Sequence, residues 1–292
     1  MPLTPTGLPA RMRPVAAALP AGIVMMLLSS FLFGLIFGSF LNVVIHRLKT
    51  RQNVIFGGSS CPKCQTKLKW HDLVPLLSFI YLRGRCRYCR KKISRQYPIV
   101  EILSGLIWAG VFYQNFNNSQ FSILNFQSIF NFQFLNAGYE IFILSVFLIV
   151  AVYDFKWKII PDKAVYPAIA VSFFYNAFSA FKFQNETMEI FIYPLLAAVI
   201  AFLFFFLIYY FSKGNAMGFG DVKLAFLIGL FLPPFSVFFA FTLAFIIGAV
   251  FGIILMLFGK KTLKSQIAFA PFLVLGAVIV FFFQNFIDLL IF

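Results

Sequence analysis

The stretch MGFGDVK, residues 217–223, places Asp221 and two glycines directly before the apolar run 224–233. Only nine Asp and Glu residues occur among the 292 residues, so an acidic side chain at this place is unusual. Ionisable groups at membrane depth are rare, and they face the protein interior or a water-filled cavity. We expect Gly218 and Gly220 to permit backbone conformations closed to other residues and the close approach of a substrate backbone.

The composition is that of a polytopic membrane protein. Hydrophobic residues make up 61% of the chain and charged residues 11%, against about 45–50% and about 25% in soluble domains. With a mean hydropathy of +0.91, the chain has more apolar residues than the core of a soluble protein could bury. The net charge of +15 does not indicate a nucleic-acid partner, because the basic residues cluster in loops between apolar runs, where membrane topology accounts for them.

Eight apolar runs predict an all-α polytopic membrane protein with about eight transmembrane helices. The runs are 21–45, 98–116, 138–153, 164–181, 188–211, 222–232, 235–258 and 267–290. The first run is longer than the apolar core of a signal peptide, so it is interpreted as a span. The sixth is short for a hydrocarbon core of ~30 Å, so seven spans is the alternative count.

All four cysteines lie in the polar, basic loop 47–97, as two Cys-x-x-Cys pairs. The four are Cys61, Cys64, Cys86 and Cys89. Two such pairs are the ligand set of a tetrahedral structural zinc site. The alternative is two disulfides, which require an oxidising compartment. Zinc would also allow so short a segment to fold, since it can bury little apolar core alone.

Polar and small residues around the first two predicted spans are expected to serve structural roles. The small residues at 38–39 suit close helix packing. Asn42 is expected to form a hydrogen bond between helices. Glu101 lies one turn into the second predicted span, where the helix dipole favours a carboxylate.

The positive charges predict the orientation of the chain in the membrane. Of the 24 Lys and Arg residues, 21 lie in the loops 47–97 and 259–264 and around Asp154 and Asp221, and three lie on the opposite side. Positive loops stay in the cytoplasm. The sequence therefore predicts that both termini are outside and that both aspartates lie at the cytoplasmic face.

A second carboxylate, Asp154, ends the apolar run 141–153, and we expect it to meet Asp221 across helices. Two carboxylates that share a site cannot easily both ionise, so one keeps its proton. The ionised one can activate a water, and the protonated one can assist the carbonyl and the leaving amine, which is aspartic proteolysis. Two alternatives remain at this point: structural caps or ion pairs with Lys156 or Lys223, and ion or proton transport.

Several of these motifs resemble those of the prepilin peptidases, the type IV leader peptidases of the GxGD aspartic peptidase family. The GFGD of 218–221 resembles the family signature, and the segment 154–162 resembles its D-x6-PD motif. The stretches 38–44, 93–101 and 269–273 and the paired cysteines occur in the same order as in the family. Ala270 departs from the pattern, since the family usually has glycine there.

The resemblance implies an inner-membrane enzyme that removes the basic leader of prepilins and pseudopilins at the cytoplasmic boundary. Its catalytic pair carries over to Asp154 and Asp221, with Asp162 as the rival for the first position. Gly218, Gly220, Lys223 and Asp162 are then expected to support the substrate site. Members with the cysteine loop also N-methylate the new amino terminus with S-adenosylmethionine, and that activity rests here on resemblance alone.

Together these features divide the chain into three parts: 1–46, an N-terminal segment with the first helix; 47–97, a cytoplasmic zinc-binding loop domain with four cysteine ligands; and 98–292, a transmembrane aspartic peptidase domain. The expected partners are prepilin or pseudopilin substrates, membrane lipid and the pilus or secretion machinery.

Two other classes of protein compete with the peptidase. A transporter predicts polar residues deep within several spans, where this sequence has few. A non-catalytic assembly factor predicts that both aspartates can be replaced by asparagine without loss.

Overall fold

The computed structural model describes residues 21–50, 58–116, 132–182, 188–215, 217–258 and 268–284. Its main helices are α1 (Ala21–Thr50), α3 (Gln96–Phe116), α5 (Phe132–Trp157), α6 (Asp162–Lys182), α7 (Tyr193–Phe211), α8 (Phe219–Phe231), α9 (Pro234–Leu257) and α10 (Ala270–Phe282). Three shorter elements are η1 (Trp70–Asp72), α2 (Leu77–Tyr81) and η3 (Met188–Ile192). Across these ranges β-structure is limited to the isolated bridges Ser60–Lys67 and Arg85–Lys92. The all-α prediction is confirmed for this part of the chain.

Six described helices are long and apolar enough to cross a membrane, so the prediction of about eight full spans is not confirmed. The predicted spans 222–232 and 267–290 correspond to α8 and α10, which have 13 residues each. The last predicted span runs beyond residue 284, outside the described residues. Thirteen residues cover only about 20 Å, less than the hydrocarbon core. Helix α8 and the described part of the last predicted span are therefore shorter than the hydrocarbon core.

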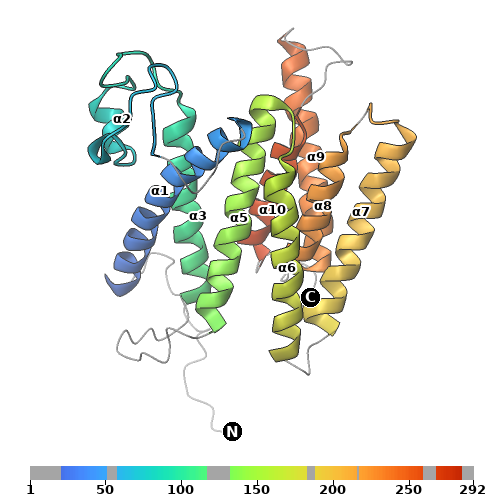
Figure 1. Cartoon of the computed structure of the whole chain (residues 1–292). Helices are drawn as coiled ribbons and strands as arrows, with labels where there is room; N and C mark the ends of the chain where they lie inside the picture. Colours follow the sequence, from blue (N-terminus) through green and yellow to red (C-terminus); the bar gives the residue numbers. More distant parts are fainter. Residues whose placement is uncertain are drawn as a thin grey trace, which may run out of the picture.

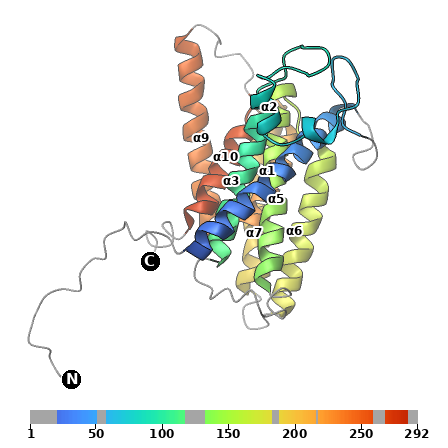
Figure 2. The same ribbon diagram turned by 90° about the vertical axis from the view of Figure 1, so that its left-hand side faces the viewer.

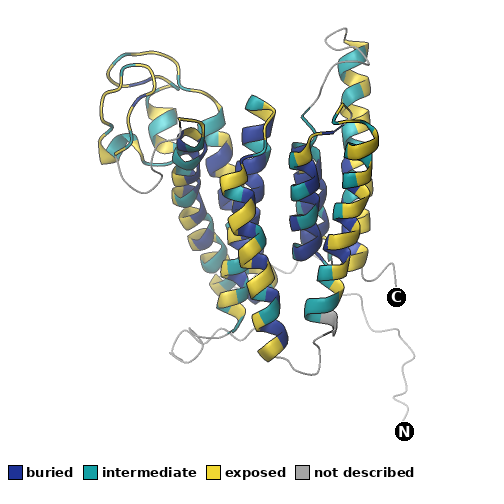
Figure 3. Cartoon of the chain, turned by 45° about the vertical axis from the view of Figure 1, so that its right-hand side comes forward, coloured by how far each residue is buried: buried dark blue, intermediate teal, exposed yellow. Residues whose placement is uncertain are grey.

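The helices are arranged so that α8 and α10 occupy the interior (Figure 1). Helix α8 packs against α6, α7, α9 and α10, and α10 also packs against α5. Most residues of α8 are buried, whereas the outer helices expose one face along their length (Figure 3). The cysteine loop and α2 lie at one end of the bundle, beside the end of α1 and the start of α3 (Figure 2).

Local sequence signals explain where the helices near that end start and stop. Helix α5 ends where Lys158 adopts a left-handed conformation, with φ of 54°, and Pro161 immediately precedes α6. Gly218 is the N-cap of α8. The pair Pro233-Pro234 separates α8 from α9, because proline cannot continue a preceding helix but fits the first turn of the next one.

Close backbone contacts at small residues hold the helix pairs together. A Cβ added at Gly34 or Gly38 of α1 would lie 2.7 Å from a Cα atom of α3, which confirms the expected close packing at residue 38. A Cβ at Gly229 of α8 would overlap the backbone of Ala198 in α7, and one at Gly276 of α10 would overlap the carbonyl of Ala240 in α9. Without a hydrophobic drive between helices in lipid, such van der Waals packing sustains the bundle.

We expect Gly229→Ala to destabilise the protein by about 1–3 kcal/mol, because the new methyl group forces α7 and α8 apart. The thermal unfolding midpoint in detergent measures the effect. Gly138→Ala is the matched control, since a Cβ at this α5 glycine meets nothing within 4 Å. An equal loss of stability in both variants would contradict the packing account.

Candidate active site and metal centre

Asp154 lies in the last turn of α5, where the chain leaves the apolar core. Its side chain is buried, with 6% of the residue exposed. The backbone N–H of Ala270, the first residue of α10, is close enough to stabilise the negative charge of the carboxylate. Among the described residues, the Asp154 Oδ2 atom has no hydrogen-bond partner. A buried oxygen without a partner is costly, so this atom is available to a proton, a water or a substrate.

Asp221 lies in the first turn of α8 and is also buried, with 8% exposed. The backbone N–H of Gly218 donates a hydrogen bond to its carboxylate. The start of a helix favours negative charge, so α8 supports this side chain with its own N-terminus. Asp221 is near enough to Asp154 for the two carboxylates to repel each other electrostatically. The two side chains therefore form one buried pair.

The two glycines before Asp221 act differently from the prediction. Gly218 has φ of −78° and ψ of 152°, an extended conformation open to any residue, so the expectation of unusual backbone angles is wrong there. A Cβ at Gly218 would lie 3.7 Å from Asp221 Oδ2, in ordinary contact. A Cβ at Gly220 would lie 2.9 Å from the Cβ of Ile160. Gly220 therefore lets the start of α8 pack directly on the loop that follows Asp154.

Asp162 and Lys223 form an ion pair beside the buried carboxylates. Lys223 Nζ contacts Asp162 Oδ1, joining the start of α6 to the start of α8. The lysine also lies over the ring of Tyr166, 5.0 Å from its centroid. The Asp162 side chain is 57% exposed, in contrast to the buried Asp154 and Asp221. Lys223 thus pairs with Asp162, and the alternative in which Lys223 pairs with Asp221 finds no support.

The four cysteines come together in two similar turns of the loop. Cys61 and Cys86 each accept a backbone hydrogen bond from the residue four positions later, Gln65 and Arg90, and both of these residues have positive φ. All four Sγ atoms lie within 4.8 Å of one another. Four thiolates at about 2.3 Å from a zinc ion lie about 3.8 Å apart, so the cluster fits a tetrahedral metal. The Cys61 and Cys89 sulfurs are 4.0 Å apart, too far for a disulfide.

Hydrogen bonds around the cysteines act on the Cys64 thiol and order the loop. Hydrogen bonds from Thr66 lower the pKa of the Cys64 thiol to about 6, and the thiolate is the form that binds metals. Although burial alone would raise the pKa of Asp72, hydrogen bonds from the Lys69 N–H, Arg87 and Tyr88 lower it. The Arg87 Nε to Asp72 Oδ1 distance is 2.7 Å. Asp72 therefore ties η1 to the second cysteine pair.

Two parts of the chain match known protein families, and the chain as a whole resembles known proteins. Residues 32–115 match the bacterial peptidase A24 N-terminal domain, and residues 141–253 match the type IV leader peptidase family. A prepilin leader peptidase/N-methyltransferase of Vibrio cholerae is 31% identical over 265 residues, which cover 85% of this chain and 93% of the relative.

The chain belongs to the type IV leader peptidase family.

Other relatives support this membership over most of the chain. A prepilin leader peptidase/N-methyltransferase of Bacillus subtilis is 29% identical over 87% of this chain and 93% of its own length. One of Burkholderia pseudomallei is 27% identical over 91% of this chain and 88% of its own length. No solved structure matches the chain.

In this leader peptidase, the sequence predictions locate the buried pair but miss some of its neighbours. Asp154, Asp221 and Gly218 come together, while Asp162 and Lys223 lie to one side as an ion pair. The stretch 269–273 stands out in the sequence only through the resemblance, yet it supplies the Ala270 N–H beside Asp154. No local pattern signals this contact, since the donor is a backbone group more than a hundred positions from the acceptor in the chain.

Hydrogen bonds also join the first three long helices at the same end. Asn42 Nδ2 donates to the Tyr97 carbonyl at 3.1 Å, which confirms the expected bond between helices. Gln96 then links Asn42 to Lys156 of α5. Glu101 is buried, and its Oε2 accepts the Leu76 N–H at 2.9 Å. The first contacts tie α1, α3 and α5 together, and the Glu101 bond attaches the cysteine loop to the end of the bundle that holds the aspartates.

A second polar cluster near the opposite end was not expected, because the sequence indicated few polar residues within the spans. Glu140 of α5 accepts hydrogen bonds from Asn115 at 2.7 Å and from Asn136 at 2.9 Å. Tyr175 of α6 donates to Asn136 at 2.7 Å. Both carboxylate oxygens of Glu140 are thus satisfied within the protein. The cluster ties α3, α5 and α6 together, and this bonding differs from that of Asp154, which retains an unpartnered oxygen.

We expect the purified protein to contain one zinc ion per chain and Cys61→Ser to lose it, because three thiolates bind zinc more weakly than four. Elemental analysis by mass spectrometry measures the zinc content. Lys63→Ala is the control, since Lys63 lies between two ligands of the same turn and is exposed. Equal zinc content in the two variants, or none in the wild type, would contradict the assignment of the four cysteines as ligands.

Proposed function

We propose that this chain is a membrane aspartic endopeptidase that removes the leader of prepilins or pseudopilins. It then N-methylates the new amino terminus with S-adenosylmethionine as the methyl donor. The observation that carries the peptidase activity is a buried pair of carboxylates from α5 and α8 in a member of the type IV leader peptidase family. The methyltransferase activity is supported by the relatives, which are named prepilin leader peptidase/N-methyltransferase.

Asp154 and Asp221 are the proposed catalytic residues, one ionised and one protonated. The ionised carboxylate takes a proton from a water whose oxygen attacks the carbonyl carbon of the scissile peptide bond. The protonated carboxyl group donates a hydrogen bond to the carbonyl oxygen as the tetrahedral intermediate forms. The C–N bond then breaks as a carboxyl group of the pair gives its proton to the leaving nitrogen, which releases a free amino terminus and the leader with a new carboxyl terminus. The backbone donors at Gly218 and Ala270 hold the two carboxylates for these steps.

Asp162 is the less suitable partner for Asp221. It is exposed and its Oδ1 is engaged by Lys223, whereas Asp154 is buried and interacts electrostatically with Asp221. We therefore assign Asp162 and Lys223 to supporting the ends of α6 and α8. Gly218 and Gly220 support the start of α8, in the turn that carries Asp221.

The active site is placed at the cytoplasmic face of the inner membrane, with both termini outside. This orientation is supported by the 21 of 24 basic residues that lie in the loops at the aspartate end. The chain then divides into 1–46, the zinc loop domain 47–97 and the peptidase domain 98–292. Zinc on the four cysteines serves a structural role, because the cluster is closed by four protein ligands and leaves no position for a reactant.

Replacing either catalytic aspartate tests the assignment directly. We expect Asp154→Asn and Asp221→Asn each to lower the rate of prepilin cleavage in liposomes by at least about 100-fold. Asparagine can neither accept nor give the proton that the carboxyl group transfers during hydrolysis. Asp162→Asn is the matched control and should reduce the rate only a few-fold, as expected for loss of an exposed ion pair. Inactivity of Asp162→Asn with an active Asp154→Asn would reverse the assignment, and full activity of all three variants would exclude the mechanism.

The two glycines should respond differently to alanine. Gly220→Ala forces Ile160 away from α8, so we expect it to lower both the unfolding temperature and the cleavage rate. Gly218→Ala has room for its methyl group, so the unfolding temperature should stay unchanged. Its methyl lies beside the Asp221 carboxylate, and it should raise KM by obstructing the substrate. The reverse pattern of stability, with Gly218→Ala the less stable variant, would refute the packing role of Gly220.

A further inference from the structure

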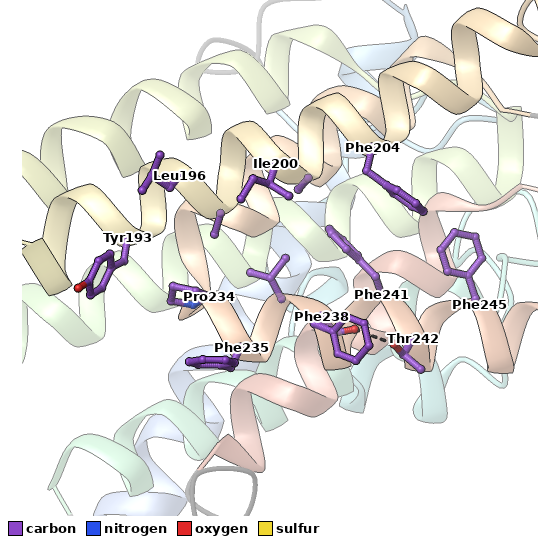
Figure 4. A pocket seen from close by; sticks show the side chains of 13 residues that line it. Tyr193, Leu196, Ile200, Phe204, Pro234, Phe235, Phe238, Phe241, Thr242 and Phe245 are labelled. Atoms are coloured by element: carbon purple, nitrogen blue, oxygen red, sulfur yellow. Dashed lines mark hydrogen bonds between the residues drawn. The ribbon is translucent and has the colours of Figure 1, made fainter. Parts of the chain in front are cut away.

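An apolar groove of about 820 Å³ lies between α7 and α9, on the outer side of the bundle (Figure 4). Its walls are formed mainly by large apolar side chains of the two helices. They include Tyr193, Ile200, Phe204, Phe235, Phe238 and Phe245. Ile200 is 65% exposed and Phe238 is 68% exposed, so these side chains are uncovered by the rest of the protein.

The groove exists because α7 and α9 each pack inward on a different helix. Helix α7 is drawn against α8 at Gly229, and α9 is drawn against α10 at Gly276. Between them, the buried Phe205 packs beneath Phe241, a lining residue, with 4.9 Å between the two ring centroids. The side of the groove away from these contacts stays open.

One end of the groove reaches the start of α10, the helix whose first residue lies beside Asp154. Phe245 lies at this end, and its ring centroid is 5.2 Å from that of Phe269. Phe269 is the N-cap of α10 and directly precedes Ala270, whose N–H is beside Asp154. The other end, at Tyr193 and Phe235, lies in the first turn of both α7 and α9. The groove therefore runs from the level of the aspartates away from the cysteine-loop end.

The dimensions and chemistry of the groove suit an α-helix. From residue 193 to residue 204, α7 rises about 16 Å, so the groove is as long as about three turns of a helix. A peptide segment that enters lipid must satisfy its own backbone hydrogen bonds, which only a helix does alone. Within the groove, the Thr242 hydroxyl is already bonded to the Phe238 carbonyl.

We infer that this groove binds the apolar helix of the substrate that follows the scissile bond. The inference rests on the proposed function and specifies how the substrate is held. A leader is the part removed from the amino-terminal side, so the retained segment begins at the aspartates and extends away from the cytoplasmic face. That is the direction in which the groove runs. The leader itself then lies on the side of the cysteine loop.

Site-specific photocrosslinking tests the position of the helix. A benzophenone amino acid is placed at Ile200 or Phe238, which line the groove, and at their neighbours Val199 or Phe239, which are exposed but lie outside it. The full chain in liposomes is mixed with a prepilin labelled at its carboxyl terminus. Adducts should form from positions 200 and 238 at least about tenfold more than from 199 and 239, because crosslinking requires direct contact. Equal substrate adducts from all four positions, or adducts with lipid alone, would overturn the inference.

Filling the groove gives an independent measurement. Ile200→Trp should lower kcat/KM for the prepilin by about tenfold, mainly through KM, while Val199→Trp should stay within about twofold of the wild type. Equal effects of the two substitutions would refute the groove as the binding site. If the wild type does not cut the prepilin, the proposed function fails. If the wild type cuts but the groove and neighbour positions behave alike, the groove inference alone fails.

Discussion

Two carboxylates buried in an apolar bundle need hydrogen-bond donors, and backbone N–H groups at helix starts supply them. Asp221 uses the turn at Gly218 before α8, and Asp154 uses Ala270 at the start of α10. Negative charge is stabilised at such helix starts by the free N–H groups and the helix dipole. A lysine in the same place would instead form an ion pair and occupy the reacting oxygens, as Lys223 does with Asp162.

This requirement accounts for where the two inner helices begin. Both α8 and α10 begin inside the bundle, at the level of the aspartates. Broken or half-length helices are tolerated at membrane depth where other protein elements surround them. Here the neighbours are α5, α6, α7 and α9.

The same close packing that supports the site also forms the proposed substrate groove. Gly229 and Gly276 draw α7 and α9 toward different inner helices, and the space between the outer helices is left open along the membrane-facing side. The cysteine loop is held at the aspartate end through the bond from the Leu76 N–H to Glu101. Substrate helix, scissile bond and leader can therefore follow one direction, from the groove past the aspartates to the loop.

The sequence by itself determined the features that depend on local pattern. Long apolar runs predict membrane helices wherever they occur, and two Cys-x-x-Cys pairs predict a metal cluster because the spacing within each pair sets the geometry of a turn. The short motifs around Asp154 and Asp221 likewise indicated the family. None of these inferences requires knowing which helices are neighbours.

Only the tertiary structure decided which faces meet. It separated Asp154 from Asp162, although one short segment contains both, because α5 directs the first into the bundle and α6 begins with the second at its surface. It showed that Gly220 is needed for contact with Ile160, and it brought the Ala270 N–H to Asp154. Such contacts join residues far apart in the chain, and the apolar pattern of a helix buried on nearly all sides does not reveal which neighbour each side will touch.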